Sequence, residues 1–337
     1  LARIFAMLRE QTRVDFTFYK QSTIVRRIER RMTVNQIREL DEYVSFMEGR
    51  RSEIMALYRE LLIGVTSFYR DARVWEQLTD QHLAGIFQNR DSKEVRMWVA
   101  GCSTGEEAYT LAMVCSDWME RYGERFDLKI FATDIDRDAI TRAGAGIYPE
   151  AVAADLNPRL LTKYFSRHGD GFQIIRTIRE SVVFAQHNLI TDPPFTNLDL
   201  VSCRNLLIYL QPVLQQKAID AFNFALNPDG LLLLGTSETT GDVSAYFECL
   251  DAKHKIYRSR GRSRQNLPSE LPGGGPRWAH DASRRLGPRP TLGVREEERL
   301  IDRLLATLTD DLLPLGVVVN EHFEVLHTGR NIHAFDP

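Results

Sequence analysis

The chain of 337 residues carries 43 Lys and Arg against 46 Asp and Glu, a formal charge of −3, and 43% of its residues are hydrophobic. At roughly 150 residues per domain, this length allows about two domains with a sizeable core. A slightly acidic chain does not favour polyanions, so we expect no nucleic-acid partner. With no signal peptide and no apolar run of about 20 residues, we expect no membrane span and a cytoplasmic rather than a secreted protein.

The first seventy residues place apolar side chains at spacings of three and four, which predicts helices rather than strands. The predicted helices are Leu1–Arg9, Ile24–Met32, Leu40–Glu48 and Ser52–Ile63. Together with a following linker, they predict a small all-helical domain over 1–75.

From Glu94 onward, short β-rich runs alternate with helical patterns such as Glu106–Arg121 and Pro212–Leu226. The predicted strands are Val95–Ala100, Lys129–Thr133, Ser181–His187, Leu198–Cys203, Gly230–Gly235 and His254–Arg258. Strands that alternate with helices predict an α/β domain with a parallel sheet over 76–260, which we expect the last of these strands to close.

The composition then changes to Gly, Pro and Ser with little to bury, and we interpret 261–293 as a flexible linker. Beyond it, Glu296–Leu312 places leucines on one helical stripe, which favours a seam with a partner helix. Leu315–Leu326 resembles two strands around Asn320–His322. Because 294–337 is too short for a free-standing domain, we interpret it as the start of a truncated one.

The four cysteines lie far apart, with no C-x-x-C pair and no nearby histidine cluster: Cys102, Cys115, Cys203 and Cys249. This spacing predicts neither a disulfide framework nor a zinc site, and we expect no metal.

The segment Val95–Ala108 predicts a strand, a turn of small residues and the start of a helix. Gly101 and Gly105 allow the backbone to turn tightly and approach a ligand, and the amides that follow can bind a carboxylate or phosphate. Asp134, at the end of the next strand, is suited to accept hydrogen bonds from both hydroxyls of a ribose. Dinucleotide-binding and S-adenosylmethionine (SAM) folds share this pairing, while an ordinary strand–turn–helix junction remains the alternative.

The choice between these two ligands depends on the loop's composition. The nicotinamide version prefers G-x-G-x-x-G, but Ser103 and Glu106 stand at its second and third glycines. Pyrophosphate needs neutral or basic surroundings, whereas Glu106 and Glu107 are acidic. These carboxylates favour the cationic sulfonium and amino group of SAM.

The segment Asp192–Phe195 reads D-P-P-F, the motif with which amino-methyltransferases hold the exocyclic nitrogen of a base. In those enzymes the motif follows the fourth strand, whereas here it precedes the predicted strand Leu198–Cys203. Arg204–Tyr209 then takes the substrate-facing place. We favour a proline-rich turn leading into a strand, and keep a nucleic-acid amino-methyltransferase as an alternative function.

Taken together, these motifs resemble the chemotaxis receptor methyltransferase (CheR) family of SAM-dependent protein-glutamate O-methyltransferases. The matching segments, in family order, are Gly64–Asp71, Ala100–Glu107, Ala132–Asp136, Gly146–Tyr148, Gln186–Leu189, Ser202–Tyr209 and Pro228–Gly230. The resemblance covers about residues 1–258. It implies a doubly wound, mostly parallel Rossmann-like sheet, a small N-terminal all-helical domain and a small β-subdomain at about 165–182. It also implies methyl transfer to glutamate carboxylates of a chemoreceptor-like protein, with S-adenosylhomocysteine (SAH) as product.

The resemblance assigns cofactor contacts beyond the two loop glycines. Including these glycines, the expected contacts are Thr66, Arg70, Gly101, Gly105, Glu107, Asp134, Asn188, Leu189, Arg204 and Asn205. Glu107 would meet the methionine end of SAM, Asp134 the ribose, and Asn188 and Leu189 the adenine. One departure is Gly64, where chemotaxis members often have Asn, so a side-chain contact there is lost.

Arg70 and Tyr209 are the catalytic candidates. A glutamate nucleophile, with a reference pKa of about 4.3, is already ionised at pH 7, so no general base is needed. The planar fork of Arg70 can bind both carboxylate oxygens, and Tyr209 can orient the same group by one hydrogen bond. The alternatives are a surface ion pair of Arg70 with Asp71 or Glu60, and a packing role for Tyr209.

We predict a basic helix over Lys20–Arg38, with six basic residues against one acid. Arg26 and Arg30, like Arg27 and Arg31, lie at i, i+4, where like charges repel, so helix stability does not favour this pattern. The basic stripe could steer the protein towards the acidic helical bundle of a chemoreceptor and so bind the substrate. A solvated face and a phosphate contact remain alternatives.

The match looks most similar to the branch of the family that is fused to other signalling modules. In that branch a PAS-type sensor follows, which Leu315–Arg330 resembles, and an esterase-like domain often precedes. We therefore expect a piece of a longer protein, starting at Leu1. The stretch between Phe165 and Phe172 is shorter than in members that dock a receptor's tail pentapeptide as an extra strand, and we expect no dependence on such a tether. A non-catalytic module that senses SAM is a further alternative.

Overall fold

The computed structural model describes residues 1–88, 92–238, 246–261, 317–319 and 325–328. Its N-terminal part consists of α1 (Ala2–Thr12), η1 (Phe16–Phe18), α2 (Gln21–Val34), α3 (Leu40–Met47) and α4 (Arg51–Leu61). These helices share one apolar core, in which Ile24 and Ile28 of α2 meet Leu57 of α4.

The basic helix is shorter than the sequence suggested. It ends at Val34 because the side chain of Asn35 donates to the carbonyl of Arg31 and Gln36 adopts the left-handed conformation, which turns the chain away. Arg38 therefore lies outside α2, and the expected range Lys20–Arg38 was wrong at its C-terminal end.

The main sheet has seven strands. They are β1 (Glu94–Ala100), β2 (Asp127–Asp134), β6 (Val182–Gln186), β7 (Leu198–Cys203), β8 (Leu226–Leu234), β9 (Phe247–Asp251) and β10 (Ile256–Ser259). Their order is β6-β2-β1-β7-β8-β10-β9. The first five in this order pair in parallel, and β10 runs antiparallel to β8 and to β9. The mostly parallel sheet is confirmed, but β9 rather than the His254–Arg258 segment forms its edge.

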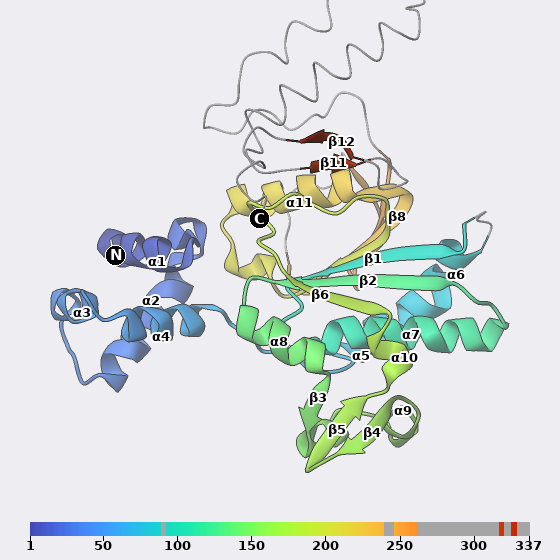
Figure 1. Cartoon of the computed structure of the whole chain (residues 1–337), viewed down its shortest axis with the longest axis horizontal. Coiled ribbons are helices and arrows are strands. Elements are labelled where there is room, and N and C mark those ends of the chain that lie inside the picture. Colours follow the sequence, from blue (N-terminus) through green and yellow to red (C-terminus); the bar gives the residue numbers. More distant parts are fainter. Residues whose placement is uncertain (89–91, 239–245, 262–316, 320–324, 329–337) are drawn as a thin grey trace, which may run out of the picture. The chain divides into compact units, whose positions relative to one another are not determined.

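Helices cover both faces of this sheet (Figure 1). On one face, Phe222 of α11 (Pro212–Ala225) packs in a cluster with Trp98 of β1. On the other, Leu111 of α7 (Glu106–Tyr122) packs with Met97 and Val99 of the same strand. Because alternate residues of β1 face opposite covered sides, the strand is apolar and buried without a break from Met97 to Ala100. This confirms the doubly wound fold.

The other short elements lie along the connections. They are α5 (Ala72–Gln77), η2 (Leu78–His82), α6 (Leu83–Phe87), α8 (Arg137–Ala145), η3 (Glu150–Ala154), α9 (Pro158–Tyr164), α10 (Arg176–Arg179) and η4 (Leu207–Tyr209). Among the described residues, we find no helix with the length and apolar character that crossing a membrane requires.

A separate three-stranded sheet, in the order β3-β5-β4, forms the β-subdomain. Its strands are β3 (Ile147–Pro149), β4 (Phe165–His168) and β5 (Gly171–Ile174). The expected start of this subdomain at about 165 was wrong. Its first strand, β3, lies earlier in the chain and pairs with β5, with Tyr148 opposite Phe172. A three-residue strand carries too little periodicity to be detected in the sequence.

The chain divides into two compact units, Leu1–Ser269 and Glu270–Pro337. In the second, β11 (Val317–Val319) and β12 (Val325–Thr328) pair antiparallel, which confirms the two expected strands. The helix expected at Glu296–Leu312, and all but Gly261 of the expected linker, lie outside the described residues.

Candidate active site

A pocket opens where β1, β2 and β7 end, at the edge where open α/β sheets bind their ligands. Most of the predicted site residues line it: Thr66, Arg70, Gly101, Glu107, Asp134, Arg204, Asn205 and Tyr209. A second pocket is lined by Asn188 and Leu189 and shares Gly101 and Asp134 with the first.

The small-residue turn after β1 needs glycine at two positions. Gly101 and Gly105 have φ angles of +75° and +96°, which side chains of L-residues rarely adopt. Gly101 lines both pockets. Gly105 lines neither, and a Cβ there would lie 2.9 Å from the Cβ of Ala143. Gly105 therefore allows α8 to pack closely against the turn.

Asp134, at the end of β2, closes the turn from the other side. Its Oδ2 accepts a hydrogen bond from Ser103 N at 2.8 Å, and its Oδ1 accepts one from Asp136 N at 2.9 Å. Burial raises the pKa of this carboxyl, while the two backbone N–H groups act in the opposite direction. Each oxygen keeps a lone pair for a ligand, so the carboxylate can accept from two neighbouring hydroxyls.

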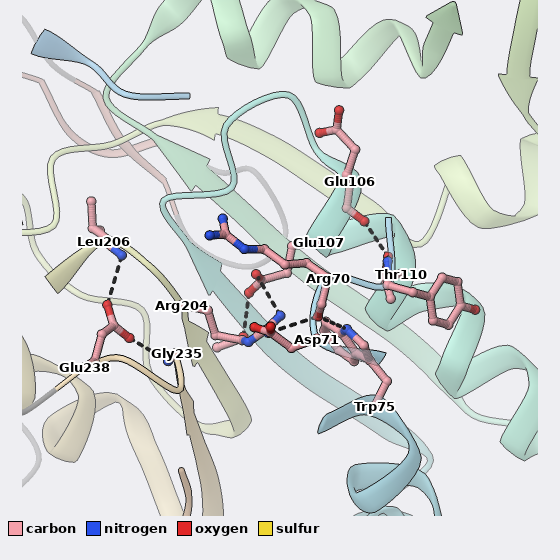
Figure 2. A network of polar contacts seen from close by, with 12 residues as sticks. Arg70, Asp71, Trp75, Glu106, Glu107, Thr110, Arg204, Leu206, Gly235 and Glu238 are labelled. Carbon is pink, nitrogen blue, oxygen red and sulfur yellow. Dashed lines mark hydrogen bonds and ion pairs between the residues drawn. The ribbon is translucent and has the colours of Figure 1, made fainter. Parts of the chain in front are cut away.

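A buried ion network ties β7 to the linker before α5 (Figure 2). The side chain of Arg204 has no exposed surface; its Nη2 donates to Asp71 Oδ2 at 2.7 Å and to the carbonyl of Arg70 at 3.0 Å, and its Nη1 lies 3.4 Å from Glu107 Oε2. Glu107 also accepts from Ser202 Oγ at 2.6 Å. Burial raises the pKa of Glu107, against the charge of Arg204. Arg204 therefore positions both the linker and Glu107.

The two adjacent acids of the turn have different surroundings. Figure 2 shows the carboxylate of Glu106 directed away from that of Glu107. Glu106 accepts hydrogen bonds from Thr104 Oγ1 and lines neither pocket. Of these two adjacent acids, Glu107 alone therefore contributes its charge to the pocket, whereas the sequence suggested this for both.

Arg70 points into the first pocket, and its Nη1 donates to the carbonyl of Val65 at 3.0 Å. Within the described part of the chain its guanidinium forms no ion pair, because Asp71 pairs with Arg204, and Glu60 with Arg27 and Arg30. The surface ion pair considered for Arg70 is therefore not formed, and the guanidinium can receive an anionic ligand.

The loop after β7 is organised by Glu238, which the sequence analysis missed. This buried carboxylate accepts from the backbone N–H groups of Leu206, Leu207 and Gly235, at 2.9, 2.7 and 2.5 Å. Asn205, on the same loop, has a left-handed φ of 60°. Its Oδ1 is buried with no hydrogen-bond partner among the described residues. A carboxylate shortly after a strand end was the available signal, as at Asp134.

The D-P-P-F segment serves its own loop. Asp192 Oδ2 accepts from Asn188 N at 2.8 Å, and the carbonyl of Pro193 lies 3.1 Å from His187 Nε2. Phe195 packs against Trp98 in the core. No residue of Asp192–Phe195 lines either pocket, so the motif closes a turn, as the favoured interpretation had it.

The four arginines expected to form a substrate-binding stripe have different partners. Arg31 is paired with the buried Glu53 through two hydrogen bonds of 3.0 and 2.7 Å, so we assign it a structural role. Arg27 and Arg30 lie 3.9 and 3.5 Å from Glu60. Arg26 is exposed and has no ion pair within the described residues.

The cysteines nearest the site, Cys102 and Cys203, are buried, which raises the pKa of each thiol. They stay protonated and pack as small apolar groups. In the part of the chain that the structure describes, no three His, Cys, Asp or Glu residues are grouped so that they could hold a metal ion.

The fold and the pocket define a Rossmann-like domain of the methyltransferase class, which follows a small helical domain in the chain. The chain belongs to the CheR methyltransferase family: residues 1–62 match its all-alpha domain and residues 64–256 its SAM-binding domain.

Curated relatives agree with this family. "Chemotaxis protein methyltransferase 2" of Vibrio cholerae is 31% identical over 71% of this chain and 84% of its own length, and the Escherichia coli chemotaxis protein methyltransferase is 30% identical over 73% and 86%. An uncharacterised 104.1 kDa protein of Rhodobacter capsulatus is 39% identical over 99% of this chain, which spans 35% of that protein.

Proposed function

We propose that this chain transfers a methyl group from SAM to glutamate carboxylates of a chemoreceptor-like signalling protein, giving a glutamate methyl ester and SAH. The observation that carries the proposal is the pocket that holds the Asp134 carboxylate and the guanidinium of Arg70, which has no ion pair within the described residues. The Asp134 carboxylate suits the hydroxyls of a nucleoside, and the Arg70 guanidinium suits an incoming carboxylate. The family match supports both parts.

The residues present fit SAM. Asp134 has lone pairs for the ribose hydroxyls, Asn205 has a buried oxygen without a partner among the described residues, and Asn188 and Leu189 line the pocket that would receive the adenine. Three carboxylates, those of Glu107, Asp134 and Asp136, line the main pocket against two guanidiniums, and this excess of negative charge suits a cationic ligand.

Asp134→Ala should raise the Kd for SAH by about 30-fold, because one charge-assisted contact is worth about 2 kcal/mol. Asp134→Asn, which keeps one acceptor oxygen, should lose less. Isothermal titration calorimetry measures both, with Asp138→Ala, exposed on α8 and outside both pockets, as the control. Unchanged affinity in Asp134→Ala would show that this carboxylate holds no part of the cofactor.

When bound, SAM supplies a methyl group on a cationic sulfonium that becomes the neutral thioether of SAH. The protein's own residues then position a nucleophile that is already ionised. Arg70 binds the oxygens of the incoming glutamate, and Tyr209, which lines the same pocket, donates one hydrogen bond to it. Positioning of this kind lowers a barrier by up to about 7–11 kcal/mol in favourable intramolecular cases.

The proposal is tested by incubating the protein with methyl-labelled SAM and a membrane extract that contains chemoreceptors, followed by mild alkali. Methyl esters hydrolyse to volatile methanol, so we expect alkali-labile label on protein. Alkali-stable label on nucleic acid would instead support an amino-methyltransferase. SAH binding with no label on any fraction would support a sensing module.

The basic face of α2 is proposed to contact the receptor through Arg26, Arg27 and Arg30. Arg26→Ala should leave the free energy of unfolding within about 0.5 kcal/mol of the wild type, because the residue is exposed. It should slow receptor methylation severalfold, and more at low ionic strength.

Arg31→Ala is the matched variant on the same helix. It should lower the free energy of unfolding by about 3 kcal/mol, because it leaves the buried Glu53 without its counterion. Urea denaturation and methylation rates at two ionic strengths check both variants. If Arg31→Ala instead keeps the stability of the wild type and slows methylation, Arg31 contacts the receptor rather than serving the fold.

We also propose that this chain is part of a longer protein with other signalling modules. The chain spans about a third of a longer relative, which agrees with fused signalling modules, and β11 and β12 agree with the start of a PAS-type sensor.

The β-subdomain is small, because the connection between β4 and β5 is short. We therefore propose that methylation does not require docking of a receptor-tail pentapeptide. Equal rates on receptors with and without that tail would support this.

A further inference from the structure

Tyr19, which the sequence analysis did not single out, is the contribution of the helical domain to both pockets. It lines the larger pocket and the smaller one, and no other described residue before Leu61 lines either. Its ring packs 4.8 Å from that of Phe16 and contacts the core of the helical domain and the core beneath α11. Tyr19 therefore lies where the helical domain meets the site.

Backbone pairing holds Tyr19 in this place. Lys20 N donates to the carbonyl of Tyr209 at 2.8 Å, and Gln211 N donates to that of Phe18 at 2.9 Å. The side chain of Gln211 adds a hydrogen bond to the carbonyl of Tyr19 at 3.1 Å. The segment before α2 thus pairs with the loop that carries Tyr209, a candidate for contact with the substrate.

The surroundings of the Tyr19 side chain suit a nucleoside. Besides Tyr19, the two pockets share Gly101, Asp134, Ile135 and Leu206, so the ring lies at the junction of their polar and apolar parts. Burial and the negative charge of Asp134 raise the pKa of Tyr19 to about 12. At neutral pH the side chain is therefore a neutral phenol, which offers an aromatic face and one hydrogen-bond donor.

We propose that the ring of Tyr19 packs against the adenine in the nucleoside half of the cofactor, so that the helical domain forms one wall of the cofactor site as well as the proposed receptor-binding face. This inference rests on the proposed function, because it takes SAM and SAH as the ligands. Since α2 begins at Gln21, the residue that contacts the nucleoside lies two positions before the basic helix.

The first test is the affinity for SAH, measured by calorimetry. Tyr19→Ala should bind SAH about 10- to 30-fold more weakly, the loss of one well-packed aromatic contact. Tyr19→Phe, which keeps the ring, should lose only a few-fold. Phe18→Ala is the matched control, because Phe18 is the neighbour of Tyr19 in the chain and its side chain is exposed and lines neither pocket. Wild-type affinity in Tyr19→Ala would overturn the inference.

A second ligand separates contact from a loosened domain. S-ribosylhomocysteine lacks the adenine of SAH, so the wild type should bind it more weakly. In Tyr19→Ala this preference for SAH should shrink, because the lost contact is between the aromatic ring of Tyr19 and the adenine. If both ligands weaken equally, Tyr19 acts only through the fold and the inference fails. If the wild type binds neither, the proposed function fails instead.

Discussion

Arg70→Ala is expected to lower kcat/KM for receptor methylation by about a thousandfold, or about 4 kcal/mol, while part of the SAH binding remains. The guanidinium lines the pocket and, within the described residues, its one side-chain hydrogen bond is to the carbonyl of Val65. It is therefore available to bind both oxygens of the incoming glutamate. Its removal leaves that carboxylate without a positioning group.

The rates come from transfer of label to purified receptor, and the binding from calorimetry with SAH. Arg70→Lys should recover part of the rate, because an ammonium keeps the charge but loses the planar fork. Arg73→Ala, exposed and outside both pockets, is the matched control. Turnover at the wild-type rate in Arg70→Ala would remove Arg70 from the substrate site.

Arg204→Ala is expected to lower the free energy of unfolding by about 3–5 kcal/mol, because it leaves Glu107 buried without its counterion. Asp71 suffers less, since 39% of its side chain is exposed and water can replace the lost partner. Urea denaturation near neutral pH measures the loss. The double variant Arg204→Ala/Glu107→Gln should recover part of it, because the unpaired charge is removed.

The same variant should depend on pH. Burial raises the pKa of Glu107 above its unfolded value, and in Arg204→Ala the opposing charge of the arginine is gone. A carboxyl with a raised pKa in the folded state binds a proton more tightly there than in the unfolded chain. The stability deficit of Arg204→Ala should therefore be fully present above the folded-state pKa of Glu107 and shrink as the pH falls through that pKa. A pH-independent deficit would show that Glu107 is not the residue left uncompensated.

The network also explains why the linker and the strand end act together. Arg204 follows β7, and it contacts Asp71 and the carbonyl of Arg70 from 133 and 134 positions away in the chain. The residue that would hold the substrate carboxylate is thus positioned from the SAM-binding domain. Sequence reasoning placed Arg204 in the site but did not predict its ion pairs, because no local pattern shows which carboxylates an arginine will meet.

Parts of the site were accessible to sequence reasoning because their geometry is local. The turn at Gly101 and the carboxylate of Asp134 end adjacent parallel strands, and such ends meet at one edge of a sheet. The D-P-P-F turn could be set aside from its position before β7 alone. Other distinctions were missed: Glu106 and Glu107 are neighbours in sequence, yet only one faces the pocket.

The sequence by itself determined the helical and β-rich segments, the two glycines of the turn and the expected family, because these depend on spacing and on the conformations that each residue type allows. Only the tertiary structure decided which charges are paired. Arg31 pairs with Glu53 and Arg204 with Glu107. Arg70 pairs with neither of the two acids considered for it, Asp71 and Glu60. It also brought Tyr19 to the pocket. Burial and ion pairing depend on segments far apart in the chain, and no local pattern encodes which of them will meet.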